Sequence, residues 1–372
     1  MIRRTLVVGG GIAGMATAIM LRRSGVPVDL IDLDPEWRVY GAGITITGPT
    51  LRAFEALGIL DRVIAGAHTA DGVQVCDVAG ERLAVIPTPA PAGSRVPGSG
   101  GIMRPTLHKI LSADVLALGT NVRLGVTVDA IENGAQAERV RFSDGTSGDY
   151  DLVVGADGVF SKVRSLLFPN APAPQLTGQA CWRLMTARLR EIDRRHYFLG
   201  GPVKAGLTPV SASEMYMFVL ENVDANVRVD PATFHRKLSD LLVAFGGPLA
   251  AVRADLNPES AIVYRPLETV LLPPPWHLGR TVIVGDAAHA TTPQLASGAG
   301  MAVEDGLVLA EEMRRAASVE EGLRGFMRRR YERCRLVVEN SVQLGRYEVD
   351  RAPVEAQTSL VALSLEKLAE AI

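Results

Sequence analysis

Apolar residues follow a strand–helix–strand pattern at the start of the chain and return to a similar pattern near its end. Residues 5–8 (TLVV) predict a buried strand, residues 15–25 a helix, and residues 27–32 (PVDLID) a second strand. Together they form a βαβ unit. Another apolar strand is expected at 281–284, and helical patterns continue from 299 to the end.

The middle of the chain follows a different pattern. Residues 73–87 predict a β-hairpin, and 88–100 (TPAPAGSRVPGSG) a loop rich in proline and glycine. Residues 179–220 alternate between apolar and polar positions, which is typical of a sheet with one exposed or pocket-lining face. Helices are expected at 50–66, with an interrupting glycine, and at 104–118. The antiparallel segments therefore interrupt the first domain twice.

Composition excludes several classes of protein. The 372 residues are 47% hydrophobic and 22% charged, and the net charge of −2 provides no field that attracts nucleic acid. Three scattered cysteines lack metal-ligand spacing, so we expect no metal site and no disulfide framework, as in a cytoplasmic protein. No apolar run reaches the length of a membrane span, so no membrane-spanning segment is expected.

A glycine-rich turn follows the first strand. Gly9, Gly11 and Gly14 match G-x-G-x-x-G between a strand and a helix. Glycines at these positions allow a tight turn and a close approach of the backbone to a pyrophosphate at the helix N-terminus. Asp32 ends the second strand, where an acid binds a ribose hydroxyl in such folds. These features predict a dinucleotide site but do not distinguish NAD from FAD.

Two further strand ends decide between them. Residues 151–158 (DLVVGADG) end in an Asp-Gly pair, and residues 281–286 (TVIVGD) end in a Gly-Asp pair. With the glycine turn, in this order, they resemble the flavin-dependent aromatic hydroxylases of the p-hydroxybenzoate hydroxylase family. The resemblance covers residues 2–345 and implies that FAD is the cofactor.

The resemblance also assigns roles to residues. It places the glycine turn and Asp32 at the ADP half of FAD, Arg104 and Asp286 at the ribityl chain, Asp157 near the pyrophosphate, and the start of a helix at 298 against the flavin ring. Ser297 replaces a glutamine that is common in the family. The complete set of implied cofactor-binding residues is Gly9, Gly11, Ile12, Ala13, Gly14, Asp32, Leu33, Thr45, Arg104, Val128, Asp157, Asp286, Gly298, Ala299, Gly300 and Met301.

The family fold is α/β. It interleaves a Rossmann-like FAD-binding domain with a mostly antiparallel substrate domain, followed here by C-terminal helices. We assign 1–72, 98–178 and 267–325 to the FAD-binding domain, 73–97 and 179–266 to the substrate domain, and 326–372 to the C-terminal helical segment.

The implied reaction is a monooxygenation. NADPH or NADH visits transiently to reduce FAD, O₂ forms a flavin C4a-hydroperoxide, and a small aromatic or heteroaromatic substrate is hydroxylated. The alternatives on the same fold are a flavin-dependent oxidase or reductase and a flavin-binding protein without turnover. The tryptophans form no W-x-W-x-I-P halogenase signature.

The sequence indicates the residues of the substrate pocket less clearly than those of the cofactor site. Pro293 lies where the family has a proline beside the flavin, and Lys204 and Tyr216 are further pocket candidates. Arg183 or Lys204 is expected to pair with a substrate anion. At the C-terminus, an apolar helical stripe predicts a packing helix, with a dimer contact or a weak membrane association as the alternatives. The protein is expected to be a monomer or homodimer. The stripe comprises Val361, Leu365, Leu368 and Ile372.

Overall fold

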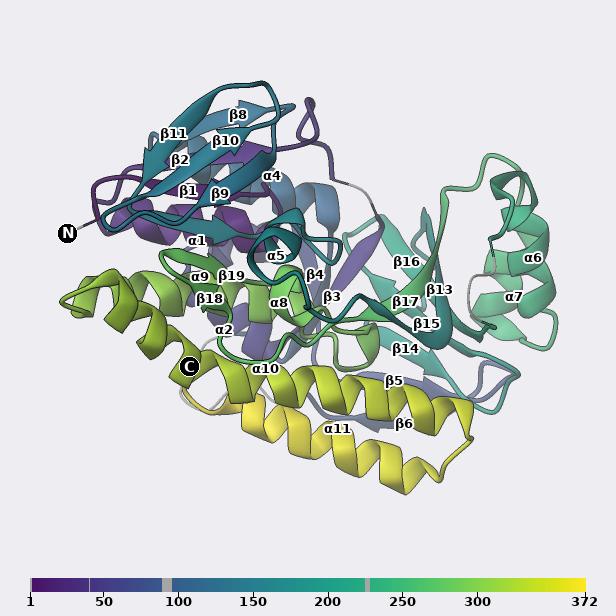
Figure 1. Ribbon diagram of the computed structural model, residues 1–372. Coiled ribbons are helices and arrows are strands. Elements are labelled where there is room, and N and C mark those ends of the chain that lie inside the picture. Colours follow the sequence, from purple (N-terminus) through teal and green to yellow (C-terminus); the bar gives the residue numbers. More distant parts are fainter. Residues whose placement is uncertain (1, 40, 89–95, 225–227) are drawn as a thin grey trace.

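The computed structural model describes residues 2–39, 41–88, 96–224 and 228–372. Most of the predicted Pro/Gly loop at 88–100 lies outside the described residues. Figure 1 shows a parallel sheet with its helices at one end of the molecule, an antiparallel sheet at the other, and two long helices along one side of both.

A six-stranded sheet forms the first half, in the order β18-β19-β12-β1-β2-β8. Neighbouring strands are parallel except for β18 and β19. The central strands are buried on both faces, as expected for a parallel sheet covered by helices. The strands are β1 (Thr5–Val8), β2 (Val28–Asp32), β8 (Asn121–Leu124), β12 (Leu152–Gly155), β18 (His277–Leu278) and β19 (Thr281–Ile283).

Helices pack tightly on this sheet. A methyl group at Gly306 would lie 2.7 Å from the backbone nitrogen of Thr17, so a glycine is needed for α1 and α9 to pack this closely. The predicted helix at 50–66 is two helices separated by a turn that contains Gly58. The helices are α1 (Ile12–Arg23), α2 (Gly48–Ala56), α3 (Leu60–Ala65), α4 (Arg104–Ala117) and α9 (Gly298–Arg315).

A seven-stranded sheet forms the second half, in the order β17-β13-β16-β15-β14-β5-β6. Every neighbouring pair is antiparallel except β14 and β5. The predicted hairpin at 73–87 thus joins the same sheet as the strands from 175 onward. The strands are β5 (Val73–Cys76), β6 (Arg82–Ile86), β13 (Gln175–Ala187), β14 (Arg195–Phe198), β15 (Lys204–Pro209), β16 (Glu214–Asn222) and β17 (Ile262–Thr269).

One face of this sheet forms a second apolar core with two short helices, α6 (Phe234–Leu241) and α7 (Gly247–Ala254). Neither helix was expected from the sequence. Each has eight residues, shorter than the windows in which helical periodicity is reliable. With one face buried against them, the other face of the sheet is left to line a cleft.

Two smaller sheets and several short helices complete the fold. Two three-stranded antiparallel sheets have the orders β11-β10-β9 and β3-β7-β4. The predicted Asp144-Gly145 turn joins β10 to β11, and Gly145 has a φ of +82°, which suits glycine. The bounds are β3 (Gly43–Thr47), β4 (Ala67–Thr69), β7 (Ser99–Met103), β9 (Val128–Glu132), β10 (Glu138–Phe142), β11 (Ser147–Tyr150), α5 (Lys162–Leu167), α8 (Asp286–His289), η1 (Pro231–Thr233) and η2 (Pro293–Leu295).

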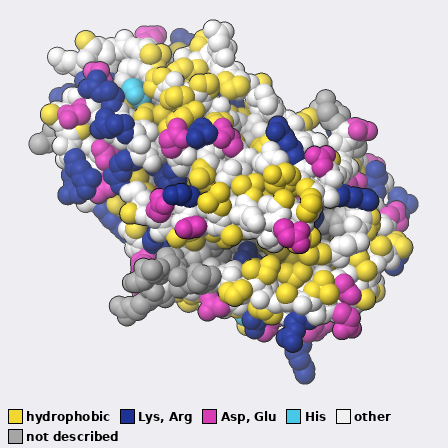
Figure 2. Space-filling view, turned by 90° about the horizontal axis from the view of Figure 1, so that it is seen from below, with side chains coloured by type: hydrophobic (Ala, Val, Ile, Leu, Met, Phe, Trp, Pro, Cys, Tyr) yellow, Lys and Arg dark blue, Asp and Glu magenta, His cyan; other side chains and the backbone are white. Residues whose placement is uncertain are grey.

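Two helices end the chain, α10 (Val319–Val349) and α11 (Val354–Ala369). The proposed domain boundary at 326 falls inside α10. Leu368 is buried, whereas Leu363 is on the outside of α11, as the apolar stripe predicts. Figure 2 views the molecule from the side of these helices and shows apolar side chains interspersed with charges of both signs. Among the described residues, no helix is long and apolar enough to cross a membrane.

Candidate active site

A cleft lies between the carboxyl ends of the parallel strands and the open face of the seven-stranded sheet. Its volume of about 370 Å³ is in the range of small-molecule sites. The sequence-predicted residues that line it are Gly11, Ile12, Ala13, Thr45, Arg104, Lys204, Tyr216, Asp286, Pro293, Gly298 and Ala299. Segments more than 250 residues apart in sequence thus meet at one site.

The glycine turn forms one end of the cleft. Gly9 has a φ of +105°, and a methyl group there would lie 2.4 Å from the carbonyl oxygen of Ala156. A methyl group at Gly14 would lie 1.8 Å from the carbonyl oxygen of Gly9. Gly11, in contrast, has no atom within 4 Å of this position and faces the cleft. Two of the glycines therefore serve close packing, and the third leaves space for a ligand at the start of α1.

Asp32 supports this turn from the end of β2. Its Oδ2 accepts a hydrogen bond of 2.6 Å from the backbone N–H of Gly10, and its Oδ1 accepts one of 2.8 Å from Asp34. The predicted cofactor residues Leu33 and Val128 do not line the cleft: Leu33 is 67% exposed, and Val128 is fully buried in β9. Their assignment to the cofactor stays a prediction.

Asp157 has a local role at the end of β12. Its carboxylate accepts hydrogen bonds from the Ser161 hydroxyl and from the backbone N–H groups of Lys162 and Val163, at 2.5–3.0 Å. These bonds satisfy the start of α5, where carboxylates are favoured. Its neighbours Ala156 and Gly158 line the cleft. A contact between the cofactor and Asp157 itself stays a prediction.

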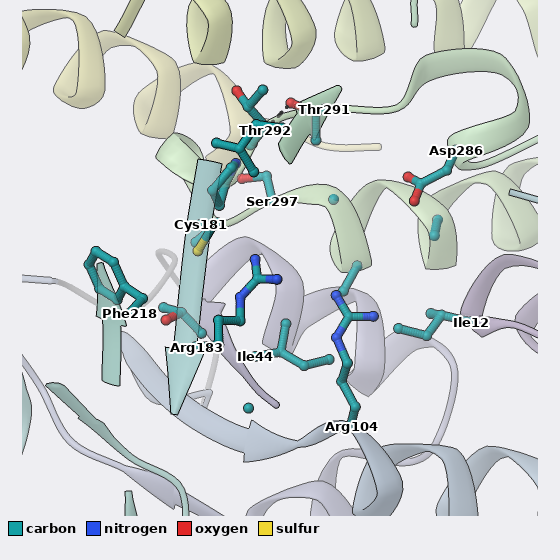
Figure 3. Close-up of a pocket in the computed structure, with 18 of the residues that line it drawn as sticks. Ile12, Ile44, Arg104, Cys181, Arg183, Phe218, Asp286, Thr291, Thr292 and Ser297 are labelled. Atoms are coloured by element: carbon teal, nitrogen blue, oxygen red, sulfur yellow. Dashed lines mark hydrogen bonds between the residues drawn. The ribbon is translucent and has the colours of Figure 1, made fainter. Parts of the chain in front are cut away.

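Three charged side chains face the middle of the cleft. Arg104 and Arg183 point into it from α4 and β13, and Asp286 faces them from the start of α8 (Figure 3). None of the three side chains forms a hydrogen bond or ion pair with another residue in the part of the chain that the structure describes. Polar groups in a cleft without protein partners are suited to bind a ligand.

The electrostatics of these groups are coupled. Burial raises the pKa of the Asp286 carboxyl, although the charges of His289 and Arg104 oppose this effect. Burial and the nearby Arg183 cation lower the pKa of Arg104, whereas Asp286 raises it. A ligand that hydrogen-bonds to Asp286 and brings negative charge to the arginines relieves both costs.

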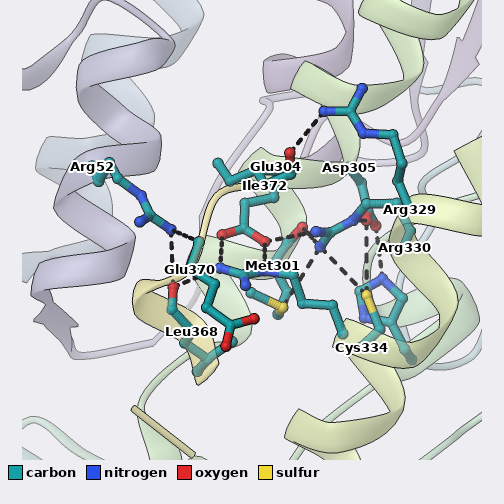
Figure 4. A network of polar contacts seen from close by, with 12 residues as sticks. Arg52, Met301, Glu304, Asp305, Arg329, Arg330, Cys334, Leu368, Glu370 and Ile372 are labelled. Atoms are coloured by element: carbon teal, nitrogen blue, oxygen red, sulfur yellow. Dashed lines mark hydrogen bonds and ion pairs between the residues drawn. The ribbon is translucent and has the colours of Figure 1, made fainter. Parts of the chain in front are cut away.

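A buried ionic network holds the turn that presents Asp286. Asp305 accepts hydrogen bonds from the backbone N–H of Gly285 at 2.8 Å, from His289 Nε2 at 2.7 Å and from Arg330 Nε at 2.8 Å. Arg330 also pairs with Glu304 at 2.7 Å (Figure 4). Burial opposes ionisation of Asp305, but His289 and Arg330 outweigh it and lower its pKa to about 2.

The same network explains the role of His289. The pKa of His289 is raised well above its usual value: burial opposes protonation, but nearby Cys334 and Asp305 favour it. Side-chain atoms of His289, Asp305 and Cys334 lie within 4.8 Å of one another, as metal ligands would. Asp305, however, is already bonded to Arg330. The prediction of no metal site stays a prediction.

The start of α9 forms the wall opposite the glycine turn. Gly298 and Ala299 line the cleft, and the first N–H groups of a helix have no acceptor within it. The predicted residues Gly300 and Met301 have other surroundings. Gly300 packs against Thr50, and the Met301 N–H is bonded to the Ser297 carbonyl at 2.9 Å. The Ser297 hydroxyl donates to the Leu295 carbonyl, so it does not replace the missing glutamine amide.

Aromatic and polar residues of the seven-stranded sheet complete the cleft. Alternate residues of β13 and β16 face it, as the period-two pattern predicts, and β14 and β15 contribute one residue each. The Tyr216 hydroxyl is hydrogen-bonded to Thr45, and the rings of Tyr197 and Phe218 meet edge to face at 5.7 Å. Lys204 reaches the cleft but is bonded to Glu348 of α10. Tyr197, Gln294 and Glu348 were not predicted, and Glu348 has no local sequence signal because only the tertiary fold brings α10 to the sheet.

The cleft fits FAD. The open space at Gly11 lies at the N-terminus of α1, where a pyrophosphate is favoured. Arg104 and Asp286 lie further along the cleft without protein partners among the described residues, and suit a phosphate-linked, hydroxyl-bearing chain. The start of α9 then offers backbone N–H groups to an electron-rich ring.

Comparison with known proteins agrees with this geometry. A family model described as "FAD binding domain" matches residues 3–341. The chain is 33% identical over 308 residues to the 2-heptyl-3-hydroxy-4(1H)-quinolone synthase of Pseudomonas aeruginosa, covering 82% of this chain and 79% of that protein. It is 30% identical over 346 residues to the aurachin C monooxygenase/isomerase of Stigmatella aurantiaca, covering 91% and 88%.

Solved structures agree on the fold. The Klebsiella pneumoniae HpxO structure complexed with FAD and uric acid superposes with a TM-score of 0.83 at 24% identity, covering 99% of this chain and 93% of that one. The chain therefore belongs to the FAD-binding-domain family of FAD-dependent aromatic hydroxylases. It is an FAD-dependent flavoprotein monooxygenase, and the predicted fold class and cofactor are confirmed.

Proposed function

We propose that the protein hydroxylates a small planar aromatic or heteroaromatic compound in the half of the cleft next to the seven-stranded sheet. The overall reaction is R–H + NAD(P)H + H⁺ + O₂ → R–OH + NAD(P)⁺ + H₂O. The observation that supports it best is the wall of Arg183, Tyr197, Tyr216 and Phe218 on the same cleft as Asp286. Aromatic side chains pack against a planar ring, and a guanidinium pairs with a ring oxyanion.

Bound FAD supplies the transfer of electrons from NADH or NADPH and the activation of O₂, and the residues of the chain position the substrate. Burial raises the pKa of the Tyr216 phenol, although its hydrogen bond with Thr45 opposes this. Tyr216 therefore stays protonated near neutral pH and acts as a hydrogen-bond donor or acceptor rather than as an anion. Pro293 lines the cleft without an N–H to donate, and its carbonyl already accepts a hydrogen bond of 3.0 Å from the Ala296 N–H.

The relatives and the cleft together favour a planar heteroaromatic substrate. One relative is named for a 4-quinolone and a structural neighbour was solved with uric acid, and both compounds are planar nitrogen heterocycles with exocyclic oxygens. Since the three cysteines are buried and unpaired, we also propose a cytoplasmic protein, as a monomer or homodimer.

The test is a panel of phenols, 4-quinolones and purines, scored by consumption of NADH and NADPH and by mass spectrometry of the products. We expect one class to stimulate consumption and to gain a single oxygen atom. If every compound yields only H₂O₂ in an amount equal to the NAD(P)H consumed, the protein is an oxidase and the proposal is wrong.

A further inference from the structure

Lys204 faces the cleft from β15, but its charge is already paired. Its Nζ lies 2.5 Å from Oε1 of Glu348, near the end of α10. The Glu348 side chain is 9% exposed and that of Lys204 is 27% exposed, toward the cleft. Burial works against the Lys204 ammonium, but the Glu348 carboxylate outweighs this and raises the lysine pKa. Lys204 therefore stays protonated, and its charge is already paired within the protein.

Glu348 is fixed in this position by two amides. Its Oε2 accepts hydrogen bonds from Gln179 at 3.3 Å and from Gln294 at 3.2 Å. The Gln294 amide also donates to the Gln179 carbonyl oxygen at 2.9 Å. Both carboxylate oxygens are therefore occupied, and β13, β15, η2 and α10 meet at this one side chain. The hydrogen bonds to the carboxylate restrict the arrangement of the network, although Oε1 of Gln294 is buried without a partner among the described residues.

Arg183 is a second cation on the same face of the sheet, and its surroundings differ from those of Lys204. It lines the cleft two residues along β13 from Cys181, and it is paired across the strands with Phe218. Figure 3 shows its guanidinium pointing into the cleft. Among the described residues, no acidic side chain pairs with it. An anionic ligand at this wall thus meets one compensated and one uncompensated cation.

We propose that Glu348 of the C-terminal helix sets the charge of the substrate cleft, by neutralising Lys204 and leaving Arg183 as the cation that an anionic aromatic ligand meets. The inference rests on the proposed function for the location of the ligand. It adds a specificity-determining residue from a segment outside both sheets. Glu348 acts through Lys204 and is a positioning residue.

The alternative is that the ligand anion contacts Lys204 directly and displaces Glu348. Substitution of Lys204 alone does not distinguish the proposal from this alternative, because Lys204→Met weakens anion binding in both cases. In our proposal the weakening comes from the uncompensated Glu348 charge that remains. Removing both charges should then restore the wild-type affinity.

The experiment compares four holoenzymes: wild type, Lys204→Met, Glu348→Gln and Lys204→Met/Glu348→Gln. Ligand Kd values come from the change in the visible flavin spectrum, with benzoates and the matching benzamides as anionic and neutral probes. A unit change in charge within the cleft should alter the benzoate Kd by ~10-fold. We expect Glu348→Gln to bind benzoate more tightly, Lys204→Met more weakly, and the double variant within about 3-fold of wild type. Benzamide Kd values should be nearly constant.

Two results would overturn the inference: a double variant that binds benzoate as weakly as Lys204→Met, or no gain of affinity in Glu348→Gln. Lys204→Met/Glu348→Met gives a second form of the neutral cleft, since buried ion pairs are often replaced by apolar pairs without loss of stability. Failure of the proposed function is visible separately in the wild type, as a flavin spectrum that no aromatic ligand perturbs, and it would overturn both proposals.

Discussion

At the scale of single residues, the site depends on side chains that have no protein partner among the described residues, where burial makes this costly. Asp286 lies at a strand end with a raised pKa, and Arg104 faces it with a lowered one, each because of burial first. Both observations are explained if a ligand completes the hydrogen bonds and charges of this part of the cleft.

Asp286→Ala tests this assignment. Removing a carboxylate that accepts hydrogen bonds from a ribityl chain should weaken FAD binding by about 10-fold or more, because such charge-assisted bonds contribute roughly 1.5–3 kcal/mol. Flavin fluorescence titration of the apoprotein measures the Kd. Asp255→Ala, an exposed carboxylate after α7, is the matched control. Equal FAD affinity in the two variants would contradict the role of Asp286.

Arg183→Gln tests the role of a second single residue, on the substrate side of the cleft. If Arg183 pairs with a substrate oxyanion, its loss should raise the KM for an ionised substrate by ~10–100-fold and leave the FAD Kd unchanged. Steady-state kinetics against a neutral analogue provides the control, since that KM should change little. A parallel loss for both substrates would show that Arg183 only supports the sheet.

At the scale of elements, the three glycines of the glycine turn have different structural roles. Gly9 and Gly14 allow close packing of the backbone, whereas Gly11 at the start of α1 faces open space with an ordinary extended backbone, φ −76° and ψ −171°. The sequence motif treats the three alike, and only the surroundings separate them.

The comparison of Gly11→Ala with Gly14→Ala tests this division. Gly11→Ala should change the free energy of unfolding of the apoprotein by less than about 0.5 kcal/mol, because its methyl group meets no atom. It should still weaken FAD binding, since the methyl occupies the approach to the pyrophosphate. Gly14→Ala should destabilise the apoprotein by about 1–3 kcal/mol through overpacking. Chemical denaturation measures both, and a stable Gly14→Ala apoprotein would contradict the packing role.

Whether an element could be predicted from the sequence depended on how local its signal is. The βαβ unit, the three strand ends and the start of α9 were predictable because their signals are local: periodicity, glycine spacing and a carboxylate after an apolar run. Helices α6 and α7 were missed because each has only eight residues. Lys204 was predicted to face the pocket, but its partner Glu348 lies 144 residues away, and no local pattern encodes such a contact.

At the scale of the whole molecule, a buried ionic network joins α9, α10 and the turn after β19 beside the cofactor cleft. Asp305 of α9 connects the backbone of Gly285 to Arg330 of α10, and the packing of α9 on α1 brings this network close to the glycine turn. The C-terminal helices thus stabilise the turn that carries Asp286 and supply Glu348 to the substrate wall.

Acid denaturation tests the network. The pKa of Asp305 is lowered to about 2 by His289 and Arg330 despite burial, so its contribution is present above its ordinary pKa of 3.8 and is lost as the pH falls below that value. Roughly 2 kcal/mol of the free energy of unfolding should disappear in this range. Asp305→Asn should be less stable at pH 7 by about 3–5 kcal/mol and should show a flatter pH dependence. An unchanged slope in the variant would contradict the account.

The most direct test of aromatic hydroxylation in this cleft is the product formed under ¹⁸O₂ by the FAD-loaded protein, with NAD(P)H and a ligand that perturbs its flavin spectrum. The account predicts one ¹⁸O atom in the aromatic product for each NAD(P)H consumed, less any amount diverted to H₂O₂. An unlabelled ligand, recovered unchanged while NAD(P)H is oxidised to NAD(P)⁺ and O₂ is reduced to H₂O₂, would contradict it.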